Sequence, residues 1–528
     1  MQSQACLFLL SGLMRLAGIS TPLTLAPLQS FAQDSSSPST LRVQSQLVVL
    51  DVVVTDAQGN VMTNLDRSDF SIYQNGAEQD IRNFDAPGKI SPIPVKAPKD
   101  RYGHDDWGNA PLTMLVIDAM NTPFEEIAYS REEVDRYLET QPALLKQPTI
   151  ILWLNDAGFH PVTAFLRDRD ALISAINSHK ASLAGKLNRG AVVEQLSASL
   201  SALQQMALFS VGNKGSKQIL WVGRSFPRVD GTLLNAAQLD LLKKAVGSTL
   251  DLLMASRTSV YVIDPTVSTK PLPEDPVSNI ANPNVITQFA SDDAFATSFS
   301  FTEFVKRTGG KYFYGRNDLN NEIESSITRA TSSYTLSYVP SDAIQDDKYR
   351  KIDIRLRDPK LVVQAKQGYY PASQTPNTLS AKDLQFGLHE AIVSGMVYNG
   401  VGLRLEHCQL DANQISTSCN AMVDNHSLTG VSGPGDSQRA SIVAVISALD
   451  SKFVLLANKV YRFDLKNVPD QAAQNSFTNI SLHITIPPNA QVVRVAIRDT
   501  SGRIGTADLD PSLVKGLIAA NPIPKKTR

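Results

Sequence analysis

Four short apolar runs constrain the fold of this chain more than any other feature of its sequence. They are LTMLVID (112–118), TIILWLND (149–156), KQILWVG (217–223) and TSVYVID (258–264). None of them alternates apolar with polar residues, so each strand is expected to be buried on both faces of a parallel sheet. Between the runs, apolar residues recur three or four positions apart, as in amphipathic helices. This repetition predicts a doubly wound α/β domain with a mostly parallel sheet over 111–330.

The segments on either side of this region have a different periodicity. Residues 41–86 and 331–371 alternate apolar and polar residues, as strands with one solvent-facing side do, and Asn75-Gly76 is a strong hairpin signal. Each segment has too few strands to be stable alone. We therefore expect them to form one β-sandwich domain into which the α/β domain is inserted, with the Pro- and Gly-rich residues 87–110 as a linker. Residues 381–520 predict a separate C-terminal β-sandwich.

Length and charge narrow the possible functions. With 528 residues the chain is too long for one hydrophobic core. Lys plus Arg is 50 against 51 for Asp plus Glu, a formal net charge of -1, so no overall field attracts nucleic acid. After the first residues no stretch is apolar for long enough to be a transmembrane segment. We expect a multidomain protein with no nucleic-acid partner and no transmembrane segment in the mature chain.

The N-terminus and the cysteines bear on the compartment. Residues 1–32 are largely apolar and end in Ser30-Phe31-Ala32, the small-x-small pattern that precedes a signal-peptidase cleavage. We expect a signal peptide and a secreted, periplasmic or cell-envelope protein. The alternatives are a wrongly assigned start and a cytosolic protein, because Arg15 interrupts the apolar stretch. In an oxidising compartment Cys408 and Cys419 could form a disulfide; two unpaired buried thiols are the alternative.

Several stretches, taken in order, resemble one family. They are VVVTDAQGNVMTNLDRSDFSIYQNGAEQDIRNF, LTMLVIDAMNT, FLRDRDALISAI, RTGGKYFY and YTLSYVPSDAIQDDKYRKIDIRLRDPKLVVQAKQGYY. Together they are similar to the acidobacterial VWFA-related domain family, a branch of the von Willebrand factor type A (vWA) fold. The resemblance covers about 41–371, and 381–528 resembles only weakly the β domain that some members carry. It implies a vWA-like α/β domain with a metal-ion-dependent adhesion site at the carboxyl ends of its strands, where an open α/β sheet also has its ligand crevice.

The residues at this predicted site depart from the family pattern. The first strand of the parent fold ends Asp-x-Ser-x-Ser, and this chain has Asp118 and Thr122, with Met120 in place of a serine. The fourth strand should end in Asp, but Gly223 and Arg224 stand there, and 180–195 offers no equivalent of the Thr loop. A thioether and a cation suit magnesium poorly. We weigh a magnesium site at Asp118 and Thr122 against a degenerate site whose carboxylate is satisfied by backbone amides, and expect no cofactor.

A structural role explains Thr122 without a metal. Thr122-Pro123-Phe124-Glu125 has the pattern of a capping box, with Thr122 as N-cap and Pro123 at the first helical position. Asp118 is also well placed beside the free amides of a helix N-terminus. The strand-end face predicted to bind a ligand comprises Asp118, Asn121, Asp156, Arg224 and Asp264.

No enzyme motif accompanies this face. The sequence has no G-x-S-x-G elbow, H-E-x-x-H, phosphate loop or dinucleotide fingerprint. We therefore expect an exported, non-enzymatic adhesion protein that binds a protein or peptide, with the C-terminal sandwich as spacer or second contact. The rival is an exported hydrolase whose site in the C-terminal half would place His389, His407 or His483 beside a carboxylate and a nucleophile. A purely structural envelope protein is the third possibility.

Overall fold

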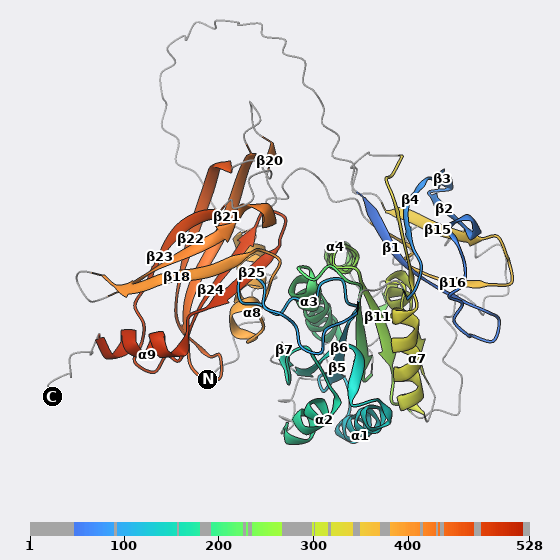
Figure 1. Cartoon of the computed structure of the whole chain (residues 1–528), viewed down its shortest axis with the longest axis horizontal. Helices are drawn as coiled ribbons and strands as arrows, with labels where there is room; N and C mark the ends of the chain where they lie inside the picture. The colour runs from blue at the N-terminus through green and yellow to red at the C-terminus, as the bar shows by residue number, and fades with distance from the viewer. Residues whose placement is uncertain are drawn as a thin grey trace, which may run out of the picture. The chain divides into compact units, whose positions relative to one another are not determined.

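The fold was analysed in a computed structural model of the whole chain. The structure describes residues 47–88, 92–155, 158–179, 192–224, 229–230, 235–266, 298–299, 301–314, 318–341, 349–369, 381–411, 416–428, 431–432, 438–468 and 477–520. The predicted signal peptide, 1–32, lies outside these residues. The described part has mixed α/β content with several sheets, one of them mostly parallel (Figure 1).

The mostly parallel sheet contains the four apolar runs as adjacent strands. Its order is β13-β11-β9-β5-β6-β7, with β8 also paired to β6. The strands β5, β6, β9, β11 and β13 are parallel, whereas β7 and β8 are antiparallel to β6. The bounds are β5 Leu112–Asp118, β6 Leu144–Asn155, β7 Gly158–Pro161, β8 Leu166–Asp168, β9 Lys217–Val222, β11 Thr258–Ile263 and β13 Tyr312–Phe313. When β8 is left out and the other six strands are numbered along the chain, their order in the sheet is 3-2-1-4-5-6, that of a doubly wound sheet.

Helices cover both faces of this sheet, which explains why its strands are apolar throughout. Along β5, Met114 and Val116 belong to one core cluster, and Leu115 and Ile117 belong to another. The first cluster includes α3, α4 and α6, and the second includes α1, α2 and α7. The bounds are α1 Phe124–Thr140, α2 Arg169–Ser178, α3 Val192–Ser210, α4 Ala236–Ala255, α6 Phe301–Arg307 and α7 Leu319–Thr331. A two-residue pair, β10 Val229–Asp230 and β12 Ser298–Phe299, lies outside the sheet.

Residues from both ends of the α/β insertion pair in two further sheets. One has the order β16-β1-β14-β4 and the other β17-β15-β2-β3, and their apolar side chains share one core cluster. Asn75 and Gly76 have φ of 49° and 84°, as a two-residue type I′ hairpin between β2 and β3 requires. The bounds are β1 Val48–Thr55, a 3-10 turn Arg67–Asp69, β2 Phe70–Gln74, β3 Ala77–Gln79, β4 Ile81–Asp85, β14 Tyr334–Tyr338, β15 Arg350–Leu356, β16 Val362–Gln364 and β17 Gly368–Tyr369.

A buried charged cluster joins these sheets to the α/β domain. The carboxylate of Asp51 on β1 accepts two hydrogen bonds from Arg257, at 2.5 and 3.3 Å. Lys366 donates to the carbonyl oxygen of Leu253 in the last turn of α4, at 2.9 Å, and Lys217 lies close by at the start of β9. Burial lowers the pKa of both lysines to about 7. One carboxylate therefore faces three basic side chains at this junction.

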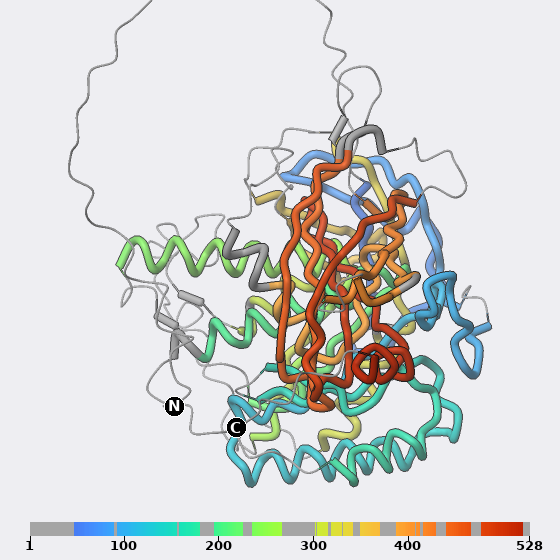
Figure 2. Tube along the Cα trace, turned by 90° about the vertical axis from the view of Figure 1, so that its left-hand side faces the viewer, coloured from blue at the N-terminus to red at the C-terminus, as the bar shows by residue number. Residues whose placement is uncertain are grey.

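The C-terminal region consists of two antiparallel sheets around one core cluster. One sheet has the order β18-β19-β23, and in the other β21 pairs with β20, β22 and β24, and β24 pairs with β25. Figure 2 shows the long strands of this region running side by side in orange and red. The bounds are α8 Ala381–Val393, β18 Leu403–Leu410, β19 Thr417–Asp424, a 3-10 turn Asn425–Ser427, β20 Val431–Ser432, β21 Gln438–Leu449, β22 Leu455–Val468, β23 Phe477–Ile484, β24 Val492–Asp499, β25 Ile504–Asp508 and α9 Pro511–Ala520.

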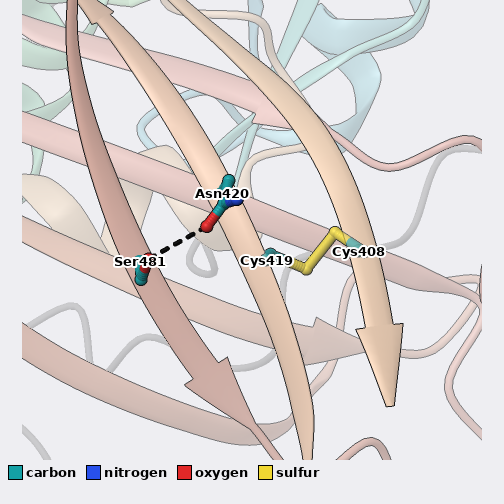
Figure 3. Close-up of a disulfide and its surroundings, with 4 residues drawn as sticks. All are labelled: Cys408, Cys419, Asn420 and Ser481. Atoms are coloured by element: carbon teal, nitrogen blue, oxygen red, sulfur yellow. Dashed lines mark hydrogen bonds between the residues drawn. A yellow bond between two sulfur atoms is a disulfide. The ribbon is translucent and has the colours of Figure 1, made fainter. Parts of the chain in front are cut away.

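Cys408 and Cys419 form a disulfide in this region. They face each other on the adjacent antiparallel strands β18 and β19. Figure 3 shows this bridge and the hydrogen bond, 2.9 Å long, from Ser481 on β23 to Asn420 on β19. All three strands of the sheet are thus linked through side chains as well as through the backbone.

The described residues of the predicted linker, 87–88 and 92–110, make specific contacts. Trp107 is buried in a small apolar cluster with Ala97, Ala110 and Leu112. The Tyr102 hydroxyl and the Arg101 guanidinium both donate to the Asp424 carboxylate at the end of β19. This segment therefore ties the α/β domain to the C-terminal sheets.

Candidate functional site

The predicted strand-end residues lie where the parallel strands end. Asp118 is the last residue of β5, Arg224 follows β9 by two residues, and Asp264 directly follows β11. Asn121 lies in the connection between β5 and α1. Because these strands are parallel, their carboxyl ends share one edge of the sheet. Asp156 lies outside the described residues.

Asp118 is fully buried and is surrounded by N–H donors. Its Oδ1 accepts from the backbone amides of Met120 and Asn121, both at 2.9 Å. Its Oδ2 accepts from the side-chain amide of Asn121 at 3.0 Å and from the indole of Trp221 at 2.9 Å. Burial raises the pKa of Asp118 to about 6, although these four hydrogen bonds act in the opposite direction. The carboxylate fixes the β5–α1 connection against β9.

Gly223 closes the space above this carboxylate. Its φ is +150°, and a Cβ added there would lie 2.6 Å from Asp118 Cβ and 2.6 Å from Thr122 Oγ1. Contacts this short do not occur, so the backbone at the end of β9 can approach β5 only because residue 223 has no side chain. The position at which the family pattern has an aspartate is therefore filled by main chain.

Thr122 does not cap α1, so the predicted capping box is wrong. The N-cap is Pro123, without a side-chain capping bond, and the helix begins at Phe124. The Thr122 hydroxyl instead accepts a hydrogen bond from the backbone amide of Arg224 at 2.8 Å. The local pattern was misleading because the backbone amide of Arg224, two residues after β9, binds the hydroxyl that an isolated helix would use.

The guanidinium of Arg224 turns back to the first turn of α1. It forms a two-point ion pair with Glu126, in which the Nε–Oε2 distance is 2.6 Å. This hydrogen bond is the main cause of the raised pKa of Arg224. The side chain of Arg224 is 42% exposed and that of Glu126 is 23% exposed, so the pair remains accessible at the surface.

Asp264 is buried next to this ion pair. Its Oδ1 accepts from the amide of Thr266 at 2.9 Å, and its Oδ2 accepts from the hydroxyl of Tyr312 at 2.7 Å. The carboxylate also acts electrostatically on Arg224. Of the predicted site residues, the structure thus links Asp118 to Asn121 and Thr122 to Arg224 by hydrogen bonds, and Asp264 to Arg224 by charge.

The donor set at the strand ends does not fit a magnesium ion. Both Asp118 oxygens already accept two N–H groups each, and a cation placed there would face those N–H dipoles. The Thr122 oxygen is likewise engaged, and Met120 lies in the apolar core. Among the described residues, no group of three or more His, Cys, Asp or Glu side chains is arranged to hold a metal.

Four residues at this face were not predicted as site residues: Glu126, Trp221, Gly223 and Tyr312. Trp221 had a sequence signal, because an indole N–H in a strand buried on both faces needs an acceptor. Gly223 had one too, since a glycine at the end of an apolar strand often marks a close approach of backbone. Glu126 and Tyr312 had none, because their partners are distant in sequence.

Comparisons with known proteins give little. No family model matches the chain, and no curated protein matches it. Among solved structures, the proximal thread matrix protein 1 of the mussel byssus has a TM-score of 0.20 and 10% identity, over 30% of this chain and 38% of its own. The SpRpn10 VWA domain has a TM-score of 0.17 and 14% identity, over 30% of this chain and 90% of its own. The likeness to a VWA domain is therefore weak and limited to part of the chain.

A third structure gives the same result. The N-terminal domain of TFIIH p34 has a TM-score of 0.17 and 12% identity, over 29% of this chain and 80% of its own. The matched part of the mussel protein is less than half of its length. In addition, none of the described helices is both long enough and apolar enough to cross a membrane.

Proposed function

We propose that this chain is an exported, non-enzymatic adhesion protein that binds a protein or peptide on its strand-end face. In this proposal the α/β domain is a vWA-like member of the VWFA-related family with a degenerate metal-ion-dependent adhesion site. The doubly wound sheet and the aspartate that ends its first strand support this assignment. The disulfide supports export to an oxidising compartment.

The observation that carries the proposal is an exposed aromatic side chain beside an accessible ion pair. Phe124, in the first turn of α1, is 57% exposed, and Glu126 of the same turn holds Arg224. Aromatic residues and arginine dominate the binding energy of protein interfaces, where they act as anchors. Their position at the carboxyl ends of the strands is that of ligand crevices in open α/β sheets.

The arrangement of the C-terminal histidines favours binding over hydrolysis. His483 Nδ1 lies 3.6 Å from Asp411 Oδ2, and the Ser416 hydroxyl donates to that same carboxylate oxygen. A hydrolytic triad needs the histidine between the serine and the acid, whereas here the acid lies between them. His389 is exposed next to Glu390, and the side chain of His407 lies outside the described residues.

Peptide selection on the full mature chain tests the proposal. Random-peptide phage are selected on the parent protein, and the affinities of the enriched peptides are measured on Phe124→Ala and on Leu513→Ala. Leu513 on α9 is a matched control because it is 54% exposed but lies in another domain. We expect Phe124→Ala to weaken binding about tenfold or more, as loss of an interface anchor does, and Leu513→Ala to leave it unchanged.

Two outcomes would contradict the proposal. Peptides that bind Phe124→Ala as tightly as the parent would place recognition elsewhere on the chain. Turnover of ester, peptide or glycoside substrates by the purified parent protein would instead support the hydrolase. The second assay is independent of the first, so the binding face and the absence of catalysis are tested separately.

A further inference from the structure

A group of basic and aromatic side chains lies around β6 and β7, on the face of the sheet covered by α1 and α2. Trp153 on β6 is paired directly with His160 on the edge strand β7. The ring of His179, which follows α2, lies 5.1 Å from the ring of Trp153, centroid to centroid. The guanidinium carbon of Arg131 on α1 lies 5.8 Å from the same ring. Three different elements thus place basic groups around one indole.

The indole N–H of Trp153 is buried and has no acceptor within the described part of the chain. The side chain is 2% exposed, yet its Nε1 forms no hydrogen bond there. A buried donor without a partner costs about 1 to 3 kcal/mol, and buried tryptophans ordinarily find an acceptor. The indole N–H of Trp153 is therefore an unused hydrogen-bond donor.

The basic groups around this indole repel one another. Burial lowers the pKa of both histidines, and the positive charges of His179 beside His160 and of Arg131 beside His179 act in the same direction. Arg131 uses one N–H on the carbonyl oxygen of Ile176, at 2.7 Å, and a guanidinium has five. Asp135, one turn along α1, is the carboxylate that faces Arg131, and Glu139 lies beyond it.

Asp135 acts electrostatically on Arg131 and offsets part of the positive charge of the group. Its Oδ1 is buried without a hydrogen-bond partner in the described part of the chain, and burial raises its pKa. A guanidinium, two imidazoles and an indole N–H are all donors or potential cations; Arg131, His160 and His179 are partly exposed, and the indole is buried behind them. Such a set is complementary to an anion with several acceptor oxygens.

We propose that Arg131, Trp153, His160 and His179 form a binding site for a small oxyanion, such as a phosphate or carboxylate group. The oxyanion accepts hydrogen bonds from the indole N–H and from the remaining guanidinium N–H groups, and its negative charge stabilises both imidazolium ions. Binding is therefore tighter at acidic pH, where the histidines are protonated. The site uses none of the residues assigned to the strand-end face.

Histidine titration by NMR on the full chain tests the site. The protein is labelled with ¹³C at histidine Cε1 and titrated in chloride, in inorganic phosphate and in acetate at equal ionic strength. We expect phosphate to raise the pKa of His160 and His179 by about one unit relative to chloride. The exposed His389 serves as an internal reference and should not respond. A response to acetate of equal size would assign the site to carboxylates, and a response to phosphate alone to phosphoryl groups.

Two variants separate binding from a general salt effect. Trp153→Phe keeps the ring and removes the N–H, and Arg131→Gln removes the charge; each should weaken phosphate binding about tenfold. Arg355→Gln is the matched control, because Arg355 also stacks on an aromatic ring, that of Tyr73 at 4.2 Å, in another domain. Equal histidine pKa values in phosphate and chloride in the parent protein would overturn the proposal, whether or not the variants fold.

Discussion

Gly223→Ala tests whether main chain has replaced a ligand at the strand ends. The added Cβ would lie 2.6 Å from Asp118 Cβ and 2.6 Å from Thr122 Oγ1. Neither atom can move freely. Asp118 is held by four N–H donors, and the Thr122 hydroxyl accepts from the amide of residue 224 itself. The strain must therefore be relieved by separating the end of β9 from the end of β5.

The size of the effect follows from this geometry. Overpacking a well-packed region costs about 1 to 3 kcal/mol, and an L side chain at a φ of +150° adds about 1 kcal/mol. We expect Gly223→Ala to lower the free energy of unfolding of the α/β domain by about 3 kcal/mol. The hydrogen bond from Trp221 to Asp118, 2.9 Å long, should lengthen or break as the strands separate.

Urea unfolding and native-state hydrogen exchange measure the two consequences. Exchange should be faster at the amides of Met120 and Asn121, which the Asp118 carboxylate protects in the parent. Gly516→Ala on α9 is the control, because a Cβ there meets nothing within 4 Å and should stabilise its helix by about 1 kcal/mol. If Gly223→Ala has the same unfolding midpoint and exchange rates as the parent, residue 223 is not closely packed against Asp118 and Thr122.

Three other predictions follow from the same structure. Asp118→Ala should lower the free energy of unfolding by about 2 to 4 kcal/mol, since four N–H donors lose their acceptor. Magnesium should change the melting temperature of neither the parent nor this variant; a magnesium-dependent rise in the parent's melting temperature would support the metal site. In the folded state the pKa of Lys217 and of Lys366 is about 7, below the unfolded value of 10.5. Burying their charge therefore lowers the free energy of unfolding most below pH 7, and this loss decreases as the pH rises to 10.5. Lys366→Met should therefore flatten the rise of stability from pH 7 to 10, and an unchanged slope in urea titrations would contradict this. A reducing agent should lower the free energy of unfolding by about 2 to 3 kcal/mol in the parent, through loss of the Cys408–Cys419 bridge, and should have no effect on the variant with alanine at both positions. An equal effect of the reducing agent on both proteins would disprove the stabilising role of the disulfide.

The central sheet could be predicted because its signal is local. Runs such as 112–118 and 258–264 are mostly apolar without alternation, and the structure buries β5 on both faces and pairs β9 with β11 in parallel. The Asn75-Gly76 hairpin was equally local. The helix start at Phe124 was missed by one residue, since the hydroxyl expected to cap it is bound by the amide of Arg224 instead.

The interactions of the candidate site could be predicted only in part. That Asp118, Arg224 and Asp264 share one edge follows from parallel strands alone. The partners of Asp118 and Arg224 do not, because Trp221 and Glu126 are each about a hundred positions away in sequence and no local spacing relates them. The sequence positions of the strand ends thus predict where polar groups gather, and packing decides whether their oxygens remain available to a ligand.

The C-terminal sheets cannot act as a detached spacer, because they share a core with the α/β domain. One apolar cluster contains Leu196 of α3, Leu388 of α8 and Val445 of β21. The side chain of Arg494, on β24, binds Asp508 at 2.6 and 2.7 Å and also donates to the carbonyl oxygen of Ala391 in the last turn of α8. Helix α3 also contacts the strand-end face, because the side-chain amide of Asn121 donates to the Ser199 hydroxyl at 3.2 Å. A change that weakens the packing of α8 should therefore alter the strand-end face through α3, although α8 carries none of its residues.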